Sequence, residues 1–312
     1  MRDAGRRSST TLVAPGELVQ LDDGVHAYVQ PDGGWCLNNA GIVVGDGGTV
    51  LVDTAATTAR ARLLHEAVRS LSPRPVGFVV NTHSHGDHTF GNAEFAGEAT
   101  VIAHERAAAD MAAHGLALTE LWPGVDWGDI RLRLPDVTFS DRMTLSSAGP
   151  RMRLLHLGPG HTAGDTVAWL PDQRVLFTGD LVFSGVTPFI LMGSLSGTLR
   201  LLDRLRALEP LHVVPGHGPV GGPELLEENA RYLRWLRELA RSGAKESVAP
   251  LELARSVGNH PFSHLLDGER LVGNLIRAYA EERGLEPAAP LDVQGAFEEM
   301  VAFNGGLPHC GA

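Results

Sequence analysis

The segment NTHSHGDHTFGNAEF concentrates side chains that can bind a metal ion. His83, His85, Asp87 and His88 fall within six positions. His83 and His85 are two residues apart, so in an extended chain both side chains point to the same side. A glycine then permits a tight turn that brings Asp87 and His88 round behind them. Ligands on either side of a turn suit two metal ions better than one, although a polar loop with surface histidines has the same composition.

Three more candidate ligands follow apolar runs later in the chain: His161 in PGHTAGD, Asp180 in LFTGDL and His217 in VVPGHGP. The run PVGFVV likewise precedes the histidine segment. Each run predicts a β-strand, and ligands in α/β proteins bind where strands end. A single histidine after a strand is more often structural. Seven nitrogen and oxygen ligands at the ends of four predicted strands are a much more specific pattern.

The set resembles that of the metallo-β-lactamase superfamily, over roughly residues 17 to 222. The resemblance implies an α/β fold, an αββα sandwich, with two divalent metal ions and a hydroxide between them. It implies that the first ion is held by His83, His85 and His161, the second by Asp87, His88 and His217, and that Asp180 bridges both. Asp87 and Asp180 are accordingly the candidate catalytic carboxylates. Zinc is the expected metal, with iron or manganese as alternatives, because His and Asp sites accept all three.

The residue types at two ligand positions indicate which branch of the superfamily the chain resembles. Position 85 is His, where the diiron oxygen-reducing branch has Glu, and position 180 is Asp, where the principal zinc lactamases have Cys. The set is most similar to thioesterase-type members such as the hydroxyacylglutathione hydrolases. Asp53, in TVLVDTA, matches the buried acid that supports ligand histidines in this family. A strand-end cap is an equally good interpretation of Asp53.

The sequence pattern predicts that the elements which position these ligands are two β-rich halves with helices between them. The strands VHAYVQ, CLNNAGIVV and TVLVDT predict a meander with a hairpin turn at GDGG. Helices are expected at 57–71, at 194–208 with Ser194 or Ser196 as the N-cap, and at 223–241. Two sheets packed face to face beneath outer helices fit this order.

The chain divides into three expected parts: a loose tail at 1–14, a metallo-β-lactamase-like domain at 15–245 and a helical C-terminal extension at 246–312. Its 312 residues suffice for one large domain with an appendage. Only two cysteines occur, which excludes a disulfide framework. Cys36 is interpreted as a packed thiol.

Composition also bounds the partners and the location. The formal net charge of −11 disfavours a nucleic-acid binder. No apolar run is long enough to span a bilayer, so a membrane partner is not expected. The N-terminal arginines are not followed by an apolar core, so we expect no signal peptide and a cytoplasmic protein. The sequence leaves the oligomeric state open, a homo-oligomer included.

Two segments are candidates for contact with a substrate. LVFSGVTPFILMG follows Asp180 directly and is too apolar for an exposed loop. We interpret its side chains as a pocket wall, with ordinary core packing as the alternative: Phe183, Phe189, Ile190 and Met192. Residues 115–136 are longer than a plain connection and carry Trp122 and Trp127. A lid over the pocket and a surface loop anchored by its tryptophans explain this segment equally well.

The groups that different substrates would release favour some hydrolysis reactions over others. A hydroxide held between two metal ions is a nucleophile at neutral pH. A thiolate departs without help because the pKa of a thiol is about 8.5, whereas an amine needs a proton donor. A phosphate diester would need cationic side chains near the metals, and the ligand loops contain no lysine or arginine beside the ligands. Hydrolysis of a thioester or ester is therefore the favoured class.

A sharper resemblance lies outside the ligands. QPDGGWCLNNAG, TPFILMGSLSGTL and MVAFNGG are similar to segments of metallo-β-lactamase-fold cyclases of aromatic polyketide pathways, most closely the actinorhodin-type second-ring cyclases. This implies aldol ring closure and thioester hydrolysis on an acyl thioester presented by an acyl carrier protein. The alternatives are a general small-thioester hydrolase similar to hydroxyacylglutathione hydrolase and, as a non-enzyme, a scaffold stabilised by its metals.

Overall fold

The computed structural model describes residues 13–95, 97, 99–146 and 149–312. Most of the expected N-terminal tail, 1–14, lies outside these described residues. The first half of the described chain forms one sheet with the strand order β1-β2-β3-β4-β5-β6-β7. Neighbours are antiparallel from β1 to β4 and parallel from β4 to β7. The strands are β1 Glu17–Asp22, β2 Val25–Val29, β3 Ala40–Gly45, β4 Gly48–Val52, β5 Val76–Val80, β6 Thr100–His104 and β7 Val137–Phe139.

A second sheet follows, with the order β12-β11-β10-β9-β8. Strands β8 to β11 pair antiparallel, and β12 returns parallel to β11. As a result β9, β11 and β12 all run in the same direction. The strands are β8 Arg142–Leu145, β9 Met152–Leu155, β10 Val167–Leu170, β11 Val175–Phe177 and β12 His212–Val214.

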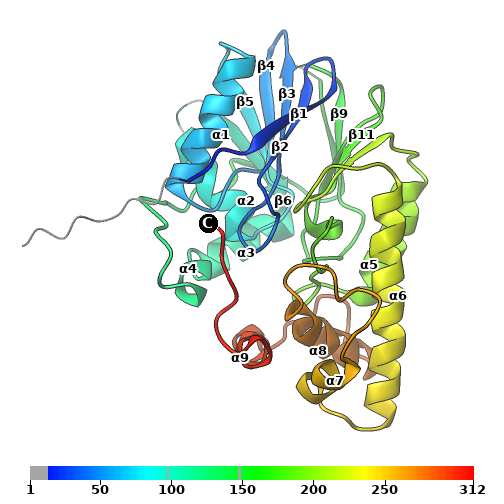
Figure 1. Ribbon diagram of the computed structural model, residues 1–312. Helices are drawn as coiled ribbons and strands as arrows, with labels where there is room; N and C mark the ends of the chain where they lie inside the picture. Colours follow the sequence, from blue (N-terminus) through cyan, green and yellow to red (C-terminus); the bar gives the residue numbers. More distant parts are fainter. Residues whose placement is uncertain (1–12, 96, 98, 147–148) are drawn as a thin grey trace, which may run out of the picture.

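Helices lie on the outer faces of these sheets and, in the view of Figure 1, below them. They are α1 Thr58–Leu71, α2 Gly86–Thr89, α3 Glu105–His114, α4 Leu118–Leu121, α5 Leu195–Arg206, α6 Glu224–Lys245, α7 Pro250–Val257, α8 Arg270–Glu282 and α9 Val293–Asn304. In Figure 1, α1 lies outside the first sheet and α5 and α6 lie outside the second. The expected αββα sandwich is therefore confirmed, and the C-terminal region carries the expected helices.

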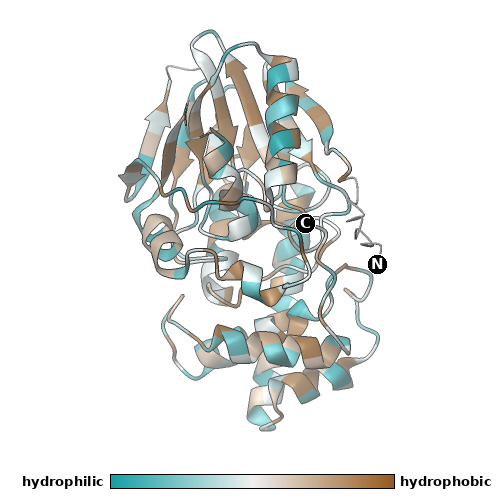
Figure 2. Cartoon of the chain, turned by 90° about the vertical axis from the view of Figure 1, so that its left-hand side faces the viewer, coloured by the Kyte–Doolittle hydropathy of each residue, from teal (hydrophilic) through white to brown (hydrophobic). Residues whose placement is uncertain are grey.

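The alternation of side chains along β4 shows why the layers form. Val50 and Val52 belong to the apolar cluster between the two sheets, whereas Leu51 packs with Leu64 and Val68 of α1. Successive strand residues point to opposite faces, so an all-apolar strand contributes side chains to the apolar clusters on both sides of its sheet. Figure 2 shows the strands in brown over much of their length, whereas the helices carry both colours, as expected for elements with one solvated face.

Three expected boundaries can be compared with the structure. Ser194, not Ser196, caps α5, because its Oγ accepts a hydrogen bond from Gly197 N at 2.8 Å. Helix α6 runs to Lys245, four residues past the expected end, and Gly243 packs closely against the Tyr279 hydroxyl of α8. Burial against another helix extended a helix whose sequence pattern ends earlier.

The strand expected over CLNNAGIVV is shorter than predicted, since β3 begins only at Ala40. The preceding residues form a turn in which Leu37 N–H donates to Gly34 O at 3.0 Å. Asn38 and Asn39 use their side-chain amides to bond backbone carbonyls, including Thr54 O at 2.9 Å and Gly218 O at 2.7 Å. Amide side chains that bond the backbone compete with strand pairing.

The C-terminal helices pack on the sandwich rather than stand apart from it. Helix α8 contacts α5, α6, α7 and α9. After α9, the chain turns back and ends beside the sheets, as the red segment in Figure 1 shows. Among the helices that the structure describes, none has the length and apolar character needed to cross a bilayer.

Candidate metal centre

Four strands deliver the predicted ligands to one edge of the sandwich. His83 and His85 follow β5, and Asp87 and His88 lie in the short helix α2. His161 follows β9, Asp180 lies in a 3-10 turn after β11, and His217 follows β12. Because β9, β11 and β12 run in the same direction, their carboxyl ends meet at the same edge of the sheet.

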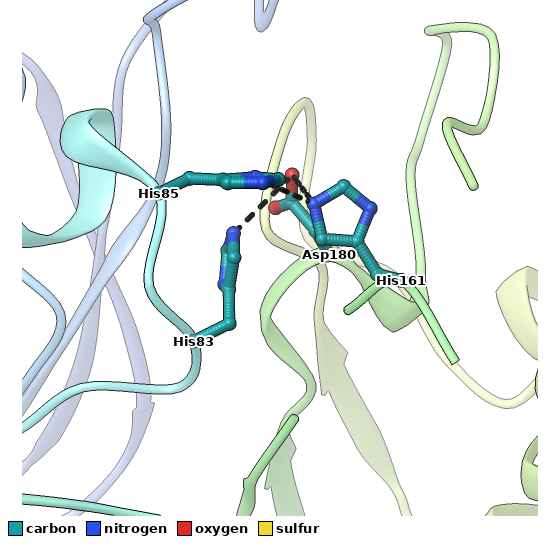
Figure 3. A group of neighbouring side chains, drawn as sticks. All are labelled: His83, His85, His161 and Asp180. Carbon is teal, nitrogen blue, oxygen red and sulfur yellow. Dashed lines mark hydrogen bonds and ion pairs between the residues drawn. The ribbon is translucent and has the colours of Figure 1, made fainter. Parts of the chain in front are cut away.

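The seven side chains form two adjoining clusters. One consists of His83, His85, His161 and Asp180, and the other of Asp87, His88 and His217. Within each cluster, the candidate ligand atoms lie within 4.8 Å of one another. Figure 3 shows the three histidine rings of the first cluster turned toward the Asp180 carboxylate. The chain folds so that all the residues singled out as ligands come together.

The Asp180 carboxylate lies between the clusters. Its Oδ2 is 3.4 Å from His161 Nε2 in the first cluster and 3.5 Å from His217 Nε2 in the second. Its Oδ1 is 3.1 Å from His88 Nε2. The close approach of the segment after β12 is possible because position 216 is glycine: a Cβ there would overlap Asp180 Oδ1. Asp180 therefore has the position that a bridging ligand requires.

Hydrogen bonds at Nδ1 orient most of the histidines. His88 Nδ1 is 2.8 Å from Asp53 Oδ2. His161 Nδ1 donates to Phe189 O at 2.5 Å, and His217 Nδ1 donates to Gly33 O at 3.0 Å. A carbonyl can only accept, so Nδ1 of His161 and His217 carries a proton, and Nε2 presents a lone pair whenever the ring is neutral. This is the tautomer that a metal ligand needs.

Asp53 supports the site and also holds the end of a strand. Its Oδ1 accepts from Thr82 N at 2.7 Å, just after β5. Its Oδ2 accepts from the Thr82 hydroxyl at 2.7 Å, and that hydroxyl is 3.0 Å from His83 Nδ1. One carboxylate therefore contacts His88 directly and His83 through Thr82. Asp53 therefore both caps the end of a strand and supports ligand histidines, the two roles that the sequence offers as alternatives.

Buried atoms without partners test whether metal ions fit. His83 Nε2, His88 Nε2 and Asp180 Oδ1 are buried and make no hydrogen bond. His88 Nε2 and Asp180 Oδ1 are nevertheless only 3.1 Å apart. Both are lone-pair atoms when His88 carries its only proton on Nδ1, so they repel unless a second proton or a metal cation lies between them. Burial disfavours a second proton on His88, but nearby carboxylates outweigh it and raise the pKa of His88 well above its usual value. Unpaired buried polar atoms are costly, and the donor set suits zinc, iron or manganese. The residues fit metal ions.

The acid–base properties of the metal-free side chains agree with this fit. Burial lowers the pKa of His85 to about 3, so this ring is neutral and able to ligate. Burial also disfavours the charged form of His217, but the Asp180 and Asp87 carboxylates outweigh it and raise the pKa of His217 to about 9. The carboxylates thus attract positive charge into the site. Metal binding would displace such protons.

An aromatic wall borders the metal ligands. The Phe183 ring stacks on His217 with centroids 5.6 Å apart, and the Phe189 ring lies 6.3 Å from His161. Trp35 packs edge-on against Phe189 at 5.3 Å. We use the term aromatic wall for Trp35, Phe183 and Phe189. Sequence reasoning missed Trp35, although it stands in the motif GGWC that carried the sharper resemblance.

All the expected pocket residues, Phe183 and Phe189 included, pack in one apolar cluster. Trp122 reaches the aromatic wall only through Trp35, at 5.4 Å, and Trp127 packs instead against Phe90. Ile190 is buried and Met192 is half-buried in the same apolar cluster. The Trp122 indole donates to Pro308 O at 2.8 Å, and Trp127 donates to Trp122 O at 3.3 Å. In this conformation, segment 115–136 is an anchored loop.

Helix α8 holds the loop that orients His161, which sequence reasoning also missed. Three buried polar residues on one helical face bond the carbonyls of residues 187–191. The Arg270 guanidinium donates to Thr187 O at 3.1 Å, and Arg277 Nε donates to Leu191 O at 2.8 Å. Asn274 donates to Pro188 O at 2.7 Å and accepts from Ile190 N at 2.9 Å. The Phe189 carbonyl that bonds His161 lies in the middle of this loop.

Comparison with known proteins agrees with this geometry. Residues 33–217 match the profile of the Metallo-beta-lactamase superfamily. The chain belongs to the metallo-β-lactamase superfamily. This is the family that the seven ligands predicted, and its members are metal-dependent hydrolases. The matched range includes all seven ligands and Trp35, but ends before α6 and the C-terminal helices.

Several characterised members of the superfamily are similar to this chain. A hydroxyacylglutathione hydrolase of Methylococcus capsulatus is 32% identical over 241 residues, which cover 76% of this chain and 81% of that protein. The α subunit of a 2,4-dinitroanisole O-demethylase of Nocardioides is 32% identical over 67% of this chain, which spans only 58% of that subunit. A Bacteroides fragilis type 2 metallo-β-lactamase is 29% identical over 67% of the chain and 82% of the lactamase.

Solved structures show the same fold. A metallo-β-lactamase from Pontibacter korlensis has a TM-score of 0.58 at 26% identity, covering 70% of this chain and 99% of that one. A metallo-β-lactamase family protein from Thermus thermophilus has a TM-score of 0.63 at 24% identity, with 85% and 95% covered. The sandwich of this chain is therefore the fold seen in solved metallo-β-lactamase structures.

Proposed function

We propose that this metallo-β-lactamase-superfamily hydrolase uses two metal ions to cleave an aromatic acyl thioester, and that it also closes a ring on a carrier-bound polyketide. The observation that carries the proposal is the aromatic wall, which borders the candidate metal ligands His161 and His217. Flat rings bury a large apolar area, and each aromatic contact adds about 0.5–1.5 kcal/mol. An aromatic acyl group would therefore be held beside the ligand cluster.

The roles of the chain's own residues follow from their positions. In this proposal His83, His85 and His161 would hold one metal ion, Asp87, His88 and His217 would hold the other, and Asp180 would serve both. Bound divalent ions would lower the pKa of water to about 7 and polarise the carbonyl that is attacked. Asp53 and the carbonyls of Gly33 and Phe189 keep the ligand rings in place. The oxygen of the attacking water would form a C–O bond to the thioester carbonyl carbon as the C–S bond breaks, and the thiolate would leave unaided, because the pKa of a thiol is about 8.5.

The segments that resemble the polyketide cyclases meet in one place, which supports the sharper proposal. Trp35 of the first segment packs on Phe189 of the second. Both Phe189 and Met300, from the third segment, surround Gly273 of α8: a Cβ there would lie 3.0 Å from the Phe189 ring and 3.1 Å from Met300 Sδ. Three segments far apart in sequence thus build one apolar region behind the ligands. Ring closure on a substrate presented by an acyl carrier protein is the function we assign to it.

The second candidate is a small-thioester hydrolase of the hydroxyacylglutathione type. It is favoured by the 32% identity to the Methylococcus capsulatus enzyme across 76% of this chain. A glutathione thioester carries carboxylates that a cationic side chain would recognise. The guanidinium of Arg270 lies over the Trp35 ring of the aromatic wall. It is buried, and its Nη2 is 2.8 Å from Asp267 Oδ2, so it is already paired and not free to bind a glutathione carboxylate.

Kinetics on two substrates separate these candidates. We expect a bicyclic aromatic acyl thioester with a pantetheine leaving group to have a higher kcat/KM than lactoylglutathione. Phe189→Leu should lower only the first value, by about tenfold, because it removes a ring but keeps the apolar volume. Phe262→Leu is the matched control, since this ring packs on Tyr232 and Trp235 instead. Faster turnover of lactoylglutathione, unchanged in Phe189→Leu, would favour the second candidate.

Metal content tests the dinuclear centre itself. Gently purified protein should contain close to two equivalents of zinc, iron or manganese, because the two clusters offer seven ligands with Asp180 between them. Chelation should abolish hydrolysis, and readdition of metal should restore it. Elemental analysis before and after dialysis against a chelator is the measurement. A metal-free protein that still turns over thioesters would contradict the proposal, and a metal-loaded protein inert on every thioester would support the scaffold alternative.

A further inference from the structure

The only two cysteines of the chain meet next to the aromatic wall. Cys36 is 2% exposed and belongs to the main apolar cluster, and Cys310 is half-buried against the same cluster. Gly311 N–H donates to Trp35 O at 3.0 Å, so the backbone beside one cysteine is bonded to the backbone beside the other. This backbone contact places Cys36 beside Cys310, and each thiol shifts the pKa of the other. Nothing in the hydrolysis proposed above uses this pair.

Several contacts fasten the residues around Cys310 in this position. We call residues 305–312 the C-terminal tail. Pro308 O accepts from the Trp122 indole at 2.8 Å, and Gly311 O accepts from the Arg60 guanidinium. A Cβ at position 311 would overlap the Leu37 side chain, so the tail packs tightly on the loop that carries Trp35. In Figure 1 the tail runs from α9 back to the sandwich.

We propose that Cys36 and Cys310 are a reversible disulfide site that locks the C-terminal tail onto the loop carrying Trp35. The oxidant is a low-molecular-weight disulfide. The two protein thiols lose two electrons and two protons, a sulfur–sulfur bond forms between them, and the small disulfide is reduced to two thiols. Thiol–disulfide exchange of this kind proceeds through a mixed disulfide.

The surroundings of the two sulfur atoms set the order of the steps. The neighbouring Cys36 thiol lowers the pKa of the Cys310 thiol, and Cys310 is also the more exposed of the two. The Cys310 thiol, together with burial, raises the pKa of the Cys36 thiol. Cys310 therefore attacks the small disulfide first and expels one thiolate. Cys36 then loses its proton, attacks the Cys310 sulfur and expels the second thiol.

The covalent link has a measurable mechanical consequence. It would join the loop after β2 to the last residues of the chain and so close almost the whole chain into a ring. A crosslink of this kind restricts the unfolded chain and stabilises the folded one. We expect the Tm of the oxidised protein to exceed that of the reduced protein by on the order of 5 °C. The link would also hold Trp35 and Trp122 against each other.

The test uses the full-length protein treated with oxidised glutathione or with dithiothreitol. After oxidation, denatured wild-type protein should take up no iodoacetamide, whereas the reduced protein should take up two equivalents. Peptide mapping should find Cys36 linked to Cys310. Cys310→Ser should take up iodoacetamide at its remaining thiol after oxidation and lose the Tm difference between the two treatments. Cys36→Ala gives a second control, and we expect it to form a stable glutathione adduct on Cys310.

Two results would overturn the proposal. One is oxidised wild-type protein that carries glutathione on either cysteine, or forms disulfide-linked dimers, without the Cys36–Cys310 peptide. The other is a linked peptide whose formation leaves the Tm unchanged, because the tail would then not be locked. Both readouts are independent of the hydrolytic activity, so they stand whichever substrate the metal centre accepts.

Discussion

We expect Asp180→Ala to lose both candidate metal ions together, and kcat/KM for thioester hydrolysis to fall by at least about 100-fold. The physical reason is the place of this carboxylate. Its oxygens lie 3.4 Å from His161, 3.5 Å from His217 and 3.1 Å from His88, so it contacts both clusters. Without it, the first cluster keeps three histidines and no carboxylate, and the second keeps Asp87, His88 and His217. Both ions would then be bound more weakly.

Elemental analysis and kinetics on the same preparation measure the effect. The apolar clusters between and outside the sheets do not include the Asp180 side chain, so the variant should fold and show a wild-type circular dichroism spectrum. Asp172→Ala is the matched control, because that carboxylate is 59% exposed and, among the described residues, forms an ion pair with Arg151 alone. A variant that keeps one metal at full affinity would show that Asp180 ligates a single ion. Full metal content and full rate would contradict any ligand role.

We expect Asn274→Leu, far from the ligands in sequence, to lower both the stability of the fold and the affinity for metal. The substitution keeps the side-chain volume but removes the hydrogen bonds to Pro188 O, Ile190 N and the Tyr232 hydroxyl. Each buried group left without a partner costs about 1–3 kcal/mol, so the free energy of unfolding should fall by about 3 kcal/mol or more. The loop of residues 187–191 also loses its central anchor.

The metal effect follows from the same loop. Phe189 O, which accepts from His161 Nδ1 at 2.5 Å, would no longer be held in place. Loss of such outer contacts typically costs about 10–100-fold in metal affinity. Denaturant unfolding and competition with a metal indicator measure the two effects. Asn304→Leu, at the exposed end of α9, is the control. A destabilised variant with unchanged metal affinity would show that α8 supports the fold but not the centre.

The C-terminal extension thus has two kinds of contact with the centre. Helix α8 reaches His161 through the loop of residues 187–191. The C-terminal tail reaches the loop carrying Trp35, whose Gly33 carbonyl bonds His217. The boundary expected at residue 245 coincides with the end of α6. The packing continues across that boundary, so the extension and the sandwich share one apolar cluster.

The sequence by itself determined the seven candidate ligands and the superfamily fold. Strand periodicity is local, and each ligand stands directly after an apolar run, so His83 or Asp180 could be placed at a strand end without knowing the partner strand. Burial of both faces leaves central strands such as β4, β10 and β11 almost wholly apolar, which makes them easy to find, whereas the edge strands β1 and β8 are mixed and partly exposed. The family match over residues 33–217 agrees with that prediction.

Only the tertiary structure decided which residues support these ligands. Arg270, Asn274 and Arg277 are polar residues on a helix, and their sequence pattern is the same whether that face is solvated or buried. In the folded chain all three are buried, and they bond carbonyls more than 80 residues earlier in the chain. Trp35 and the two cysteines meet partners from other segments in the same way. Such contacts depend on how distant segments pack together. Every residue carries a backbone carbonyl, so the type and spacing of residues do not show which carbonyl a distant side chain will bond.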